Sequence, residues 1–451
     1  MEAIIKIGQL LLSLSILIIL HELGHFLFAK LFHTRVEKFY LFFDPWFSLF
    51  KYKKGETEYG IGWLPLGGYV KISGMIDESM DREQMRKPPQ PYEFRSKPAW
   101  QRLLIMLGGV TVNLILGIVI YSMVLYTWGE KFLPNANISD GIWCVDSLAN
   151  EIGLQNGDKI LTINGTAPQK YSDILGELIF GKTMRVERDG KVKEISIPED
   201  FVGKLIENRN SILIYPRIPF IVKSIPDSSR NVHSGLMPKD EIVSIGNIPV
   251  KYFDQAASIL DTLKGKTIPV SALRNGKRIT LNLEVNNKGK FDILPAYVTF
   301  DQLQKLGTYK FETQKFTFFQ AIPAGISTAK EKLRSYIRQF KLIFNFKTGA
   351  YKGLGGFGTI GSLFPPVWEW QAFWEITALL SLILAFMNIL PIPALDGGHV
   401  SFLLYEMITG RTPGEKFLEY AQIIGLVILI FLLAYANGND LYRWIQGLLN
   451  K

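Results

Sequence analysis

Four stretches of the chain are long and apolar enough to cross a lipid bilayer, and they constrain its fold more than any other feature. A spanning helix needs about 20 mostly apolar residues. The stretches cover residues 4–29, 103–128, 372–395 and 417–436. The 451 residues are 48% hydrophobic and 20% charged, a composition that excludes a disordered chain and is unusual for a soluble protein. The sequence therefore predicts a polytopic α-helical membrane protein with four transmembrane helices.

The first apolar stretch could instead be a signal peptide that is removed after export. A signal peptide has a basic start, a short apolar core and a small-residue cleavage site. Here Lys6 is the one basic residue of the start, no A-x-A-like site follows, and the stretch carries His21 and Glu22. We therefore expect this segment to be retained as the first span.

Basic residues in two loops predict the orientation in the membrane, because short loops rich in Lys and Arg stay on the cytoplasmic side. The loop after the first span and the loop between the last two spans have this character. Their basic residues are Lys30, Arg35, Lys38, Lys51, Lys53, Lys54, Arg95, Lys97, Arg102, Arg411 and Lys416. The N-terminus and the long segment 129–370 are then expected on the outer side.

Charge and cysteine content exclude two further classes of protein. The formal net charge is +9, but the sequence has no basic stripe and no nucleic-acid-binding motif, so no nucleic-acid partner is expected. Cys144 is the single cysteine. This excludes an intramolecular disulfide and a zinc site made of several cysteines.

The long outer segment contains an internal repeat. Block 153–164 matches block 235–246, and the turn sequence 188–191 matches 274–277. The two turns are Asp-Gly and Asn-Gly pairs between alternating apolar residues, which is a strong signal for a β-hairpin. A helical stretch precedes the hairpin in both copies. Each copy is therefore predicted to be a small β-rich unit with one helix.

The G-L-x-x-G-D-x-I pattern in the first block resembles bacterial PDZ domains. The second block departs from this pattern, with Lys239 where the family has Gly. The resemblance implies two PDZ-like α+β domains, at residues 129–213 and 214–300. PDZ domains bind extended peptides, including peptide C-termini, by adding a strand to a sheet edge. The alternative is a pair of scaffold domains without a ligand.

The sharpest motif, His21-Glu22-Leu23-Gly24-His25, lies inside the first span. Residues four apart share one face of a helix, so His21 and His25 can bind one metal ion, with Glu22 beside it to take a proton from water. Titratable groups in an apolar span are costly and are by default a sign of function. The alternative is a pair of histidines that are hydrogen-bonded in a helix bundle.

A second motif, N-x-x-P-x-P-x-L-D-G, begins at Asn388 near the end of the third span and contains Asp396. A catalytic zinc ion usually has three protein ligands and one open position. Asp396 is the natural third ligand beside the two histidines. On its own, Asp396 could equally cap a following helix.

Together, H-E-x-x-H, N-x-x-P-x-P-x-L-D-G and the inserted PDZ-like units resemble the site-2 protease family over nearly the whole chain. The resemblance implies an intramembrane zinc metalloprotease with four transmembrane helices and both termini outside. The resemblance implies that His21, His25 and Asp396 bind Zn²⁺ and that Glu22 is the general base. Asn388 matches a family residue that engages the substrate helix. Asn113 matches a family asparagine in a looser motif. Segment 355–361 departs from a Ser-Gly-Pro element that relatives often carry.

Two other segments complete the expected domain organisation, which places the first two spans in 1–128 and the last two in 371–451. Residues 36–72 are rich in aromatic and β-branched residues and predict strands. The resemblance implies a membrane-associated β element that pairs with the unwound substrate; the alternative is an ordinary cytoplasmic hairpin.

Within the connector 301–370, a basic amphipathic helix is expected over 321–346. It would lie on the membrane, pack on the PDZ-like units or have one face in solvent.

The resemblance implies regulated intramembrane proteolysis in a bacterial cytoplasmic membrane. Its active site would lie towards the cytoplasm and its PDZ-like domains in the periplasm. The expected substrates are single-span membrane proteins, such as an anti-sigma factor in a stress response, or remnant signal peptides. Two alternatives are a metal transporter and a membrane-anchored PDZ scaffold with a non-proteolytic metal site. Glu22 beside His21 argues against a transporter. The complete set of His21, Glu22, His25 and Asp396 argues against a scaffold with a degenerate site.

Overall fold

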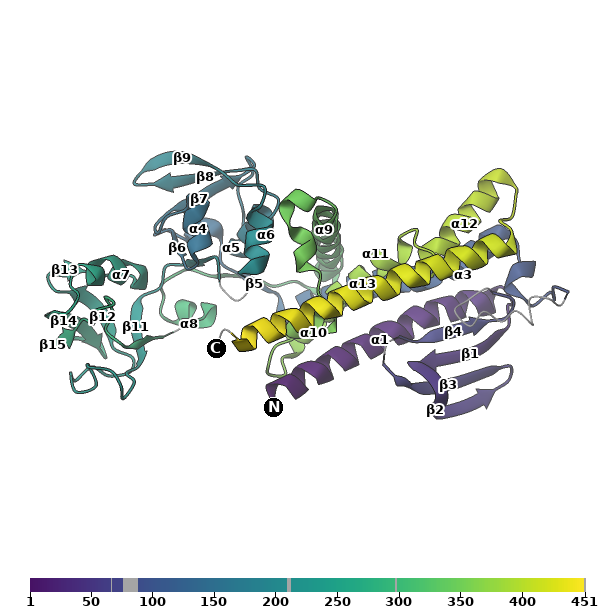
Figure 1. Cartoon of the computed structure of the whole chain (residues 1–451), viewed down its shortest axis with the longest axis horizontal. Helices are drawn as coiled ribbons and strands as arrows, with labels where there is room; N and C mark the ends of the chain where they lie inside the picture. The colour runs from purple at the N-terminus through teal and green to yellow at the C-terminus, as the bar shows by residue number, and fades with distance from the viewer. Residues whose placement is uncertain (66, 76–87, 209–211, 297, 450–451) are drawn as a thin grey trace. The chain divides into compact units, whose positions relative to one another are not determined.

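The structure is a computed structural model, and it describes residues 1–65, 67–75, 88–208, 212–296 and 298–449. The chain forms two compact units. The first, called the membrane unit here, comprises Met1–Glu130, Lys315–Phe344 and Tyr351–Lys451. The second, called the repeat unit, comprises Lys131–Gln314 and Asn345–Ala350. Figure 1 draws both units, coloured by residue number.

In the part of the chain that the structure describes, four helices are long and apolar enough to cross a membrane, as predicted. They are α1 (Glu2–Leu31), α3 (Ala99–Trp128), α11 (Trp370–Ile389) and α13 (Glu415–Leu449). Figure 1 shows α1 and α13 as the two long rods at the start and end of the colour scale. The chain is therefore a multi-pass membrane protein that also contains β-sheets.

Two of the predicted span boundaries are wrong. The third span was expected to reach residue 395, but α11 ends at Ile389, because Pro391 disfavours helical backbone in the residue before it. A separate helix, α12 (Asp396–Thr409), follows. The fourth span was expected to end at residue 436, whereas α13 continues to Leu449 with polar residues in its last turns.

Glycines allow α3 to approach its two neighbours closely. A Cβ atom on Gly24 of α1 would overlap the backbone of Gly108 on α3, and a Cβ atom on Gly117 would lie 2.7 Å from the side chain of Leu382 on α11. Small residues permit such contacts, and van der Waals packing then holds membrane helices together. A buried hydrogen bond of 3.0 Å between Thr377 and Ser13 ties α11 to α1.

Residues 36–72 form a four-stranded sheet rather than a simple hairpin. Its strands are β1 (Val36–Leu41), β2 (Phe43–Lys54), β3 (Thr57–Leu64) and β4 (Tyr69–Ile72), in the order β2-β3-β1-β4. β1 runs parallel to β3, and the other pairs are antiparallel. The two edges of the sheet are β2 and β4. The short helix η1 (Phe94–Ser96) precedes α3.

The basic amphipathic helix exists, as α9 (Phe318–Ile343), but its apolar face packs against membrane helices. Buried Ala329 contacts the cluster of α3 and α11 side chains that contains Ala378 and Leu382. The ring of Phe340 packs edge-to-face against the ring of Phe386 on α11, with 5.4 Å between the ring centroids. Of the residues of α9, Ala321, Gly325 and Ala329 are buried, whereas the basic residues Lys330, Lys332 and Arg334 are exposed, so the helix also has the solvent-facing side that was expected.

Segment 355–361 forms the start of a short helix, α10 (Phe357–Ser362), which α13 caps. The side chain of Asp440 accepts hydrogen bonds of 2.9 Å from the backbone N–H groups of Gly356 and Thr359. These donors would otherwise be unsatisfied at the helix start. The loop that departs from the Ser-Gly-Pro element therefore anchors the end of α13.

The repeat unit contains two copies of one pattern of elements. The first copy has β6 (Ile142–Cys144), α4 (Ser147–Glu151), β7 (Lys159–Ile163), α5 (Tyr171–Leu178), β8 (Thr183–Arg188), β9 (Lys191–Ser196), α6 (Phe201–Glu207) and β10 (Ile214–Pro216). The second has β11 (Phe220–Ser224), β12 (Glu241–Ile245), β13 (Ile248–Pro249), α7 (Phe253–Asp261), β14 (Thr267–Arg274), β15 (Lys277–Glu284) and β16 (Leu294–Pro295). The remaining elements are β5 (Glu130–Phe132), η2 (Asn135–Asn137), α8 (Phe300–Lys305), β17 (Glu312–Gln314), η3 (Phe346–Thr348) and η4 (Ala350–Gly353).

Strand pairing in the two copies follows the predicted hairpins. The sheets have the orders β7-β8-β9 and β15-β14-β12-β11-β16, with two further pairs, β10-β6 and β17-β5. Asp189 and Asn275 both have positive φ, of 52° and 50°, and a glycine with positive φ follows each of them. Two successive positive φ angles define the tight turn that matches the twist of a hairpin.

Each copy contains the same buried ion pair. Arg188 donates two hydrogen bonds of 2.7 Å to the carboxylate of Asp158. Arg274 donates bonds of 2.8 and 2.7 Å to Asp240. Each arginine also donates to the carbonyl of the glycine that opens its block. The end of the hairpin is therefore tied to the repeated block in the same way twice, so the repeat seen in the sequence is also one of structure.

We predict that the Cys144 thiol is inert in the folded protein. Burial, and after it the nearby carboxylates of Asp158 and Asp254, raise the pKa of Cys144 to about 12. Since the thiolate is the reactive form, alkylation at pH 8 should be on the order of a thousandfold slower than for an exposed cysteine. Iodoacetamide labelling with and without denaturant measures this. Equal labelling rates in the two conditions would contradict it.

Candidate metal centre

Helix α1 presents two histidines one turn apart on the same face. The Nε2 atoms of His21 and His25 lie 3.3 Å from each other, and the side chains are nearly buried. The spacing of four residues produces this arrangement directly, because such residues are neighbours on a helix surface.

Helix α3 holds the far side of both imidazole rings. The Nδ1 atom of His25 lies 2.9 Å from the carbonyl oxygen of Ile105. A carbonyl can only accept, so Nδ1 carries the proton and the Nε2 lone pair of His25 is available for a ligand. The Nδ2 atom of Asn113 lies 3.1 Å from the Nδ1 atom of His21, and the buried Oδ1 atom of the same amide has no partner. Exchanging the two amide atoms, which have nearly the same shape, turns Oδ1 to this nitrogen; Oδ1 then gains a donor and His21 takes the same tautomer as His25.

Asp396 reaches the two histidines from the first residue of α12. Its Oδ2 atom lies 3.2 Å from the Nε2 atom of His21 and 3.3 Å from that of His25. This oxygen is nevertheless buried without a hydrogen bond of acceptable geometry. Its position at the helix start follows from the two prolines before it, which cannot continue α11.

The three side chains fit a zinc ion. One ligand atom from each of His21, His25 and Asp396 lies within 4.8 Å of the others. Two imidazole nitrogens and a carboxylate oxygen are a usual donor set for catalytic zinc and leave one position open. A cation shared by the three side chains would explain why the Asp396 oxygen lacks a hydrogen-bond partner and why both Nε2 atoms face it.

Glu22 and Asn388 line the same cavity as the three candidate ligands. This cavity has a volume of about 750 Å³. Glu22 accepts a backbone hydrogen bond from Val70 on β4. The amide nitrogen of Asn388, at the end of α11, lies 3.2 Å from the Nε2 atom of His21. The structure therefore brings together all five residues that the two motifs singled out.

Strand β4 and helix α13 supply further walls of the cavity that the motifs did not indicate. Tyr69, Val70 and Lys71 line it from β4, and Gln422 lines it from α13. Gln422 is buried near the start of the apolar stretch of α13. A polar residue inside a predicted span is the signal that could have identified it.

Gly109 on α3 forms a further part of the site. A Cβ atom on Gly109 would lie 2.5 Å from the Nε2 atom of His25 and 2.6 Å from the Cε1 atom of His21. Any side chain there would displace the imidazoles. Because the conflict arises between two helices that are distant in sequence, the sequence alone could not assign this role to Gly109.

Comparisons with known proteins show the family to which this chain belongs. The family described as "Peptidase family M50" matches residues 9–432. The chain is 27% identical to a Treponema pallidum protein named "Putative zinc metalloprotease", over 96% of this chain and 98% of the relative. It is 25% identical to the "Regulator of sigma E protease" of Haemophilus influenzae, over 97% of this chain and 99% of the relative.

We predict that Gly109→Ala weakens zinc binding although it changes none of the candidate ligands. The new methyl group would push the two imidazoles out of position, and a loss of about tenfold or more in affinity is expected for a disturbed ligand environment. Helix propensity acts in the opposite direction, since alanine stabilises a helix by about 1 kcal/mol over glycine. Competition with a chelator measures the affinity.

The matched control is Gly8→Ala on α1, where a Cβ atom would meet nothing within 4 Å. This variant should bind zinc like the wild type. Unchanged affinity in Gly109→Ala would show that the histidines do not bind the ion in the arrangement described.

Proposed function

This chain belongs to peptidase family M50 and is a zinc metalloprotease of the site-2 type, and we propose that it cuts single-span membrane proteins within their transmembrane segments. The observation that carries the proposal is the location of the cavity. His21, Glu22 and Asp396 line it together, and α1 and α11, two apolar helices of spanning length, contribute to its walls. A peptide bond that reaches these residues must come from a segment at the level of the spans.

The ligands that we propose for zinc are His21, His25 and Asp396. When bound, zinc supplies Lewis-acid chemistry, which lowers the pKa of a water molecule towards neutrality and polarises the peptide carbonyl. The protein holds the ligands in place through α3, since Ile105 and Asn113 fix the outer nitrogens of both rings. Such outer contacts orient metal-binding histidines.

Glu22 is the proposed general base. Its carboxylate accepts a proton from the attacking water and delivers that proton to the amine that leaves. The backbone hydrogen bond from Val70 orients the carboxylate in the cavity. Asn388, from the neighbouring wall, is proposed to bind the backbone of the substrate close to the bond that is cut.

Edge strand β4 is proposed to hold the substrate in an extended conformation. The carbonyl groups of a helix are hydrogen-bonded, so a transmembrane segment must unwind before hydrolysis. An edge strand offers free backbone groups that an extended peptide can pair with. β4 is an edge of its sheet, and three of its four residues line the cavity.

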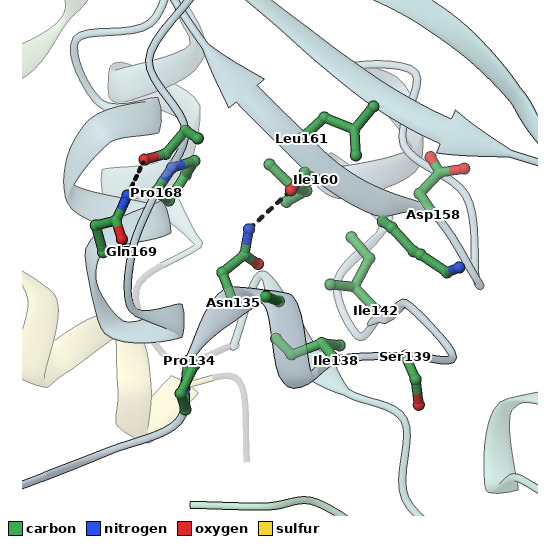
Figure 2. Close-up of a pocket in the computed structure, with 13 residues that line it drawn as sticks. Pro134, Asn135, Ile138, Ser139, Ile142, Asp158, Ile160, Leu161, Pro168 and Gln169 are labelled. Carbon is green, nitrogen blue, oxygen red and sulfur yellow. Dashed lines mark hydrogen bonds between the residues drawn. The ribbon is translucent and has the colours of Figure 1, made fainter. Parts of the chain in front are cut away.

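The two predicted domains, at residues 129–213 and 214–300, are proposed to be PDZ-like and to bind peptide ends and regulate cleavage. A cavity of about 580 Å³ in the first copy supports this (Figure 2). It lies along β7, an edge strand, with Ile138, Ile142 and Leu161 on its walls. Asn135 donates a 2.8 Å hydrogen bond to the carbonyl of Ile160 and so covers part of that edge. A bound peptide would add to the part that remains.

The proposed location is a bacterial cytoplasmic membrane, with the catalytic residues towards the cytoplasm and the repeat unit in the periplasm. The basic residues of the loops next to the spans support this orientation. Proposed substrates are an anti-sigma factor or remnant signal peptides. The name of the Haemophilus influenzae relative supports the first of these.

We predict that Glu22→Gln abolishes cleavage and retains zinc. Glutamine has nearly the same shape but cannot accept the proton, and loss of a general base costs about 10²–10⁴-fold in rate. Purified wild type and variant are compared on a model single-span substrate in detergent, with zinc measured in both. Cleavage by the variant at the wild-type rate would exclude Glu22 as the base. Zinc in both with cleavage by neither would count against the proposed function.

We predict that a substrate held by β4 forms disulfide crosslinks with a period of two. The test combines Lys71→Cys with Glu22→Gln and Cys144→Ser, and scans single cysteines along the substrate segment. Alternate substrate positions should crosslink, because side chains of a strand alternate between faces. The matched control is Lys51→Cys on β2, the other edge of the sheet, and should crosslink poorly. A period of three to four, or equal crosslinking from both edges, would exclude pairing with β4.

A further inference from the structure

Gln422 is a buried polar residue on α13 whose role the established chemistry does not explain. Its side chain is 6% exposed, whereas nearby Ile424 and Val427 on the same helix are 59% and 60% exposed. Gln422 also lines the cavity that contains Glu22 and Asp396. A polar side chain in a spanning helix that faces the interior is costly unless it makes specific contacts.

One contact of Gln422 is with the loop that carries Asp396. The backbone N–H of Ala394 donates a hydrogen bond of 3.3 Å to the Oε1 atom of Gln422. Ala394 has φ of 77°, in the left-handed region that a residue with a Cβ atom rarely adopts. Such strain persists only where surrounding contacts impose it. The Gln422 oxygen is one of these contacts, two residues before Asp396.

A second point of α13 lies against the same loop. A Cβ atom on Gly425 would overlap the carbonyl group of Pro393. Gln422 and Gly425 are three residues apart and therefore share one face of the helix. Helix α13 thus supports residues 393 and 394 from one side, and the position of Asp396 depends on this support.

The amide nitrogen of Gln422 has no such partner. Among the residues that the structure describes, no acceptor contacts it, and Gln422 is part of the cavity wall. An amide N–H₂ group at this place can donate to a backbone carbonyl of an extended peptide in the cavity.

We propose that Gln422 is a positioning and substrate-binding residue of the metalloprotease. Its oxygen holds the Ala394 loop so that Asp396 reaches the metal, and its amide N–H₂ group donates to a carbonyl oxygen of the unwound substrate. The second part rests on the proposed function; the first does not, because it concerns metal binding alone.

The test uses the full-length protein in detergent and compares Gln422→Met, Gln422→Glu and Ile424→Met with the wild type. Methionine keeps the length of the side chain and removes both polar groups. Glutamate keeps an oxygen acceptor for Ala394 and removes the amide donor. Ile424→Met is the matched control on an exposed face of α13. Zinc affinity is measured by chelator competition, and KM and kcat are measured with a model single-span substrate.

We expect Gln422→Met to bind zinc about tenfold more weakly and Gln422→Glu to bind it nearly as the wild type does. Both variants should have a raised KM, and Ile424→Met should match the wild type in all three values. Wild-type zinc affinity and KM in Gln422→Met would overturn the proposal. So would an equal loss of zinc in both variants of Gln422, since that indicates a general disturbance of α13. If the wild type binds zinc but cuts no substrate, the proposed function fails, while the zinc affinities still decide the role of Gln422 in the loop.

Discussion

The close approach of α1 and α3 is the contact on which the site depends. Gly24 and Gly108 allow the two helices to touch through their backbones, and Gly109 leaves space for both imidazole rings. At this distance the carbonyl of Ile105 and the amide of Asn113 can reach the outer nitrogens of the histidines. A larger separation would leave these nitrogens without partners in an apolar environment, which is costly.

The rest of the site is built from irregular backbone that lines the cavity. Residues 390–395 break the regular helix between α11 and α12, and Ala394 adopts a left-handed conformation there. In a membrane, non-helical backbone is tolerated where it is buried in protein or faces a polar cavity. Contacts from α13 and from β4 meet this requirement, and they also place Asp396 and Glu22 in the same space. The features that stabilise the loop and those that support the chemistry are therefore the same contacts.

Much of the site could be predicted from the sequence, because its strongest signals are local. His21 and His25 are four residues apart on one helix, and Asn388 and Asp396 belong to one short motif. The hairpins of the repeat were predictable for the same reason, since Asp-Gly and Asn-Gly turns act within four residues. Predictions failed where a signal depended on distant partners. The apolar composition of residues 372–395 put the predicted end of the third span after Pro391, and the packing of α9 against α3 and α11 depends on contacts that no local pattern describes.

The sequence by itself determined that the chain crosses a membrane, that it contains a repeat, and that one span carries two histidines spaced to bind one metal ion. These properties follow from apolar length, internal similarity and helical periodicity, which each act within a few turns of chain. The tertiary structure alone decided which edge of the β-sheet lines the cavity with Glu22, that Gly109 must lack a side chain, and that Gln422 meets the loop before Asp396. These decisions depend on contacts between segments that are tens to hundreds of residues apart, and only packing brings them within hydrogen-bonding distance.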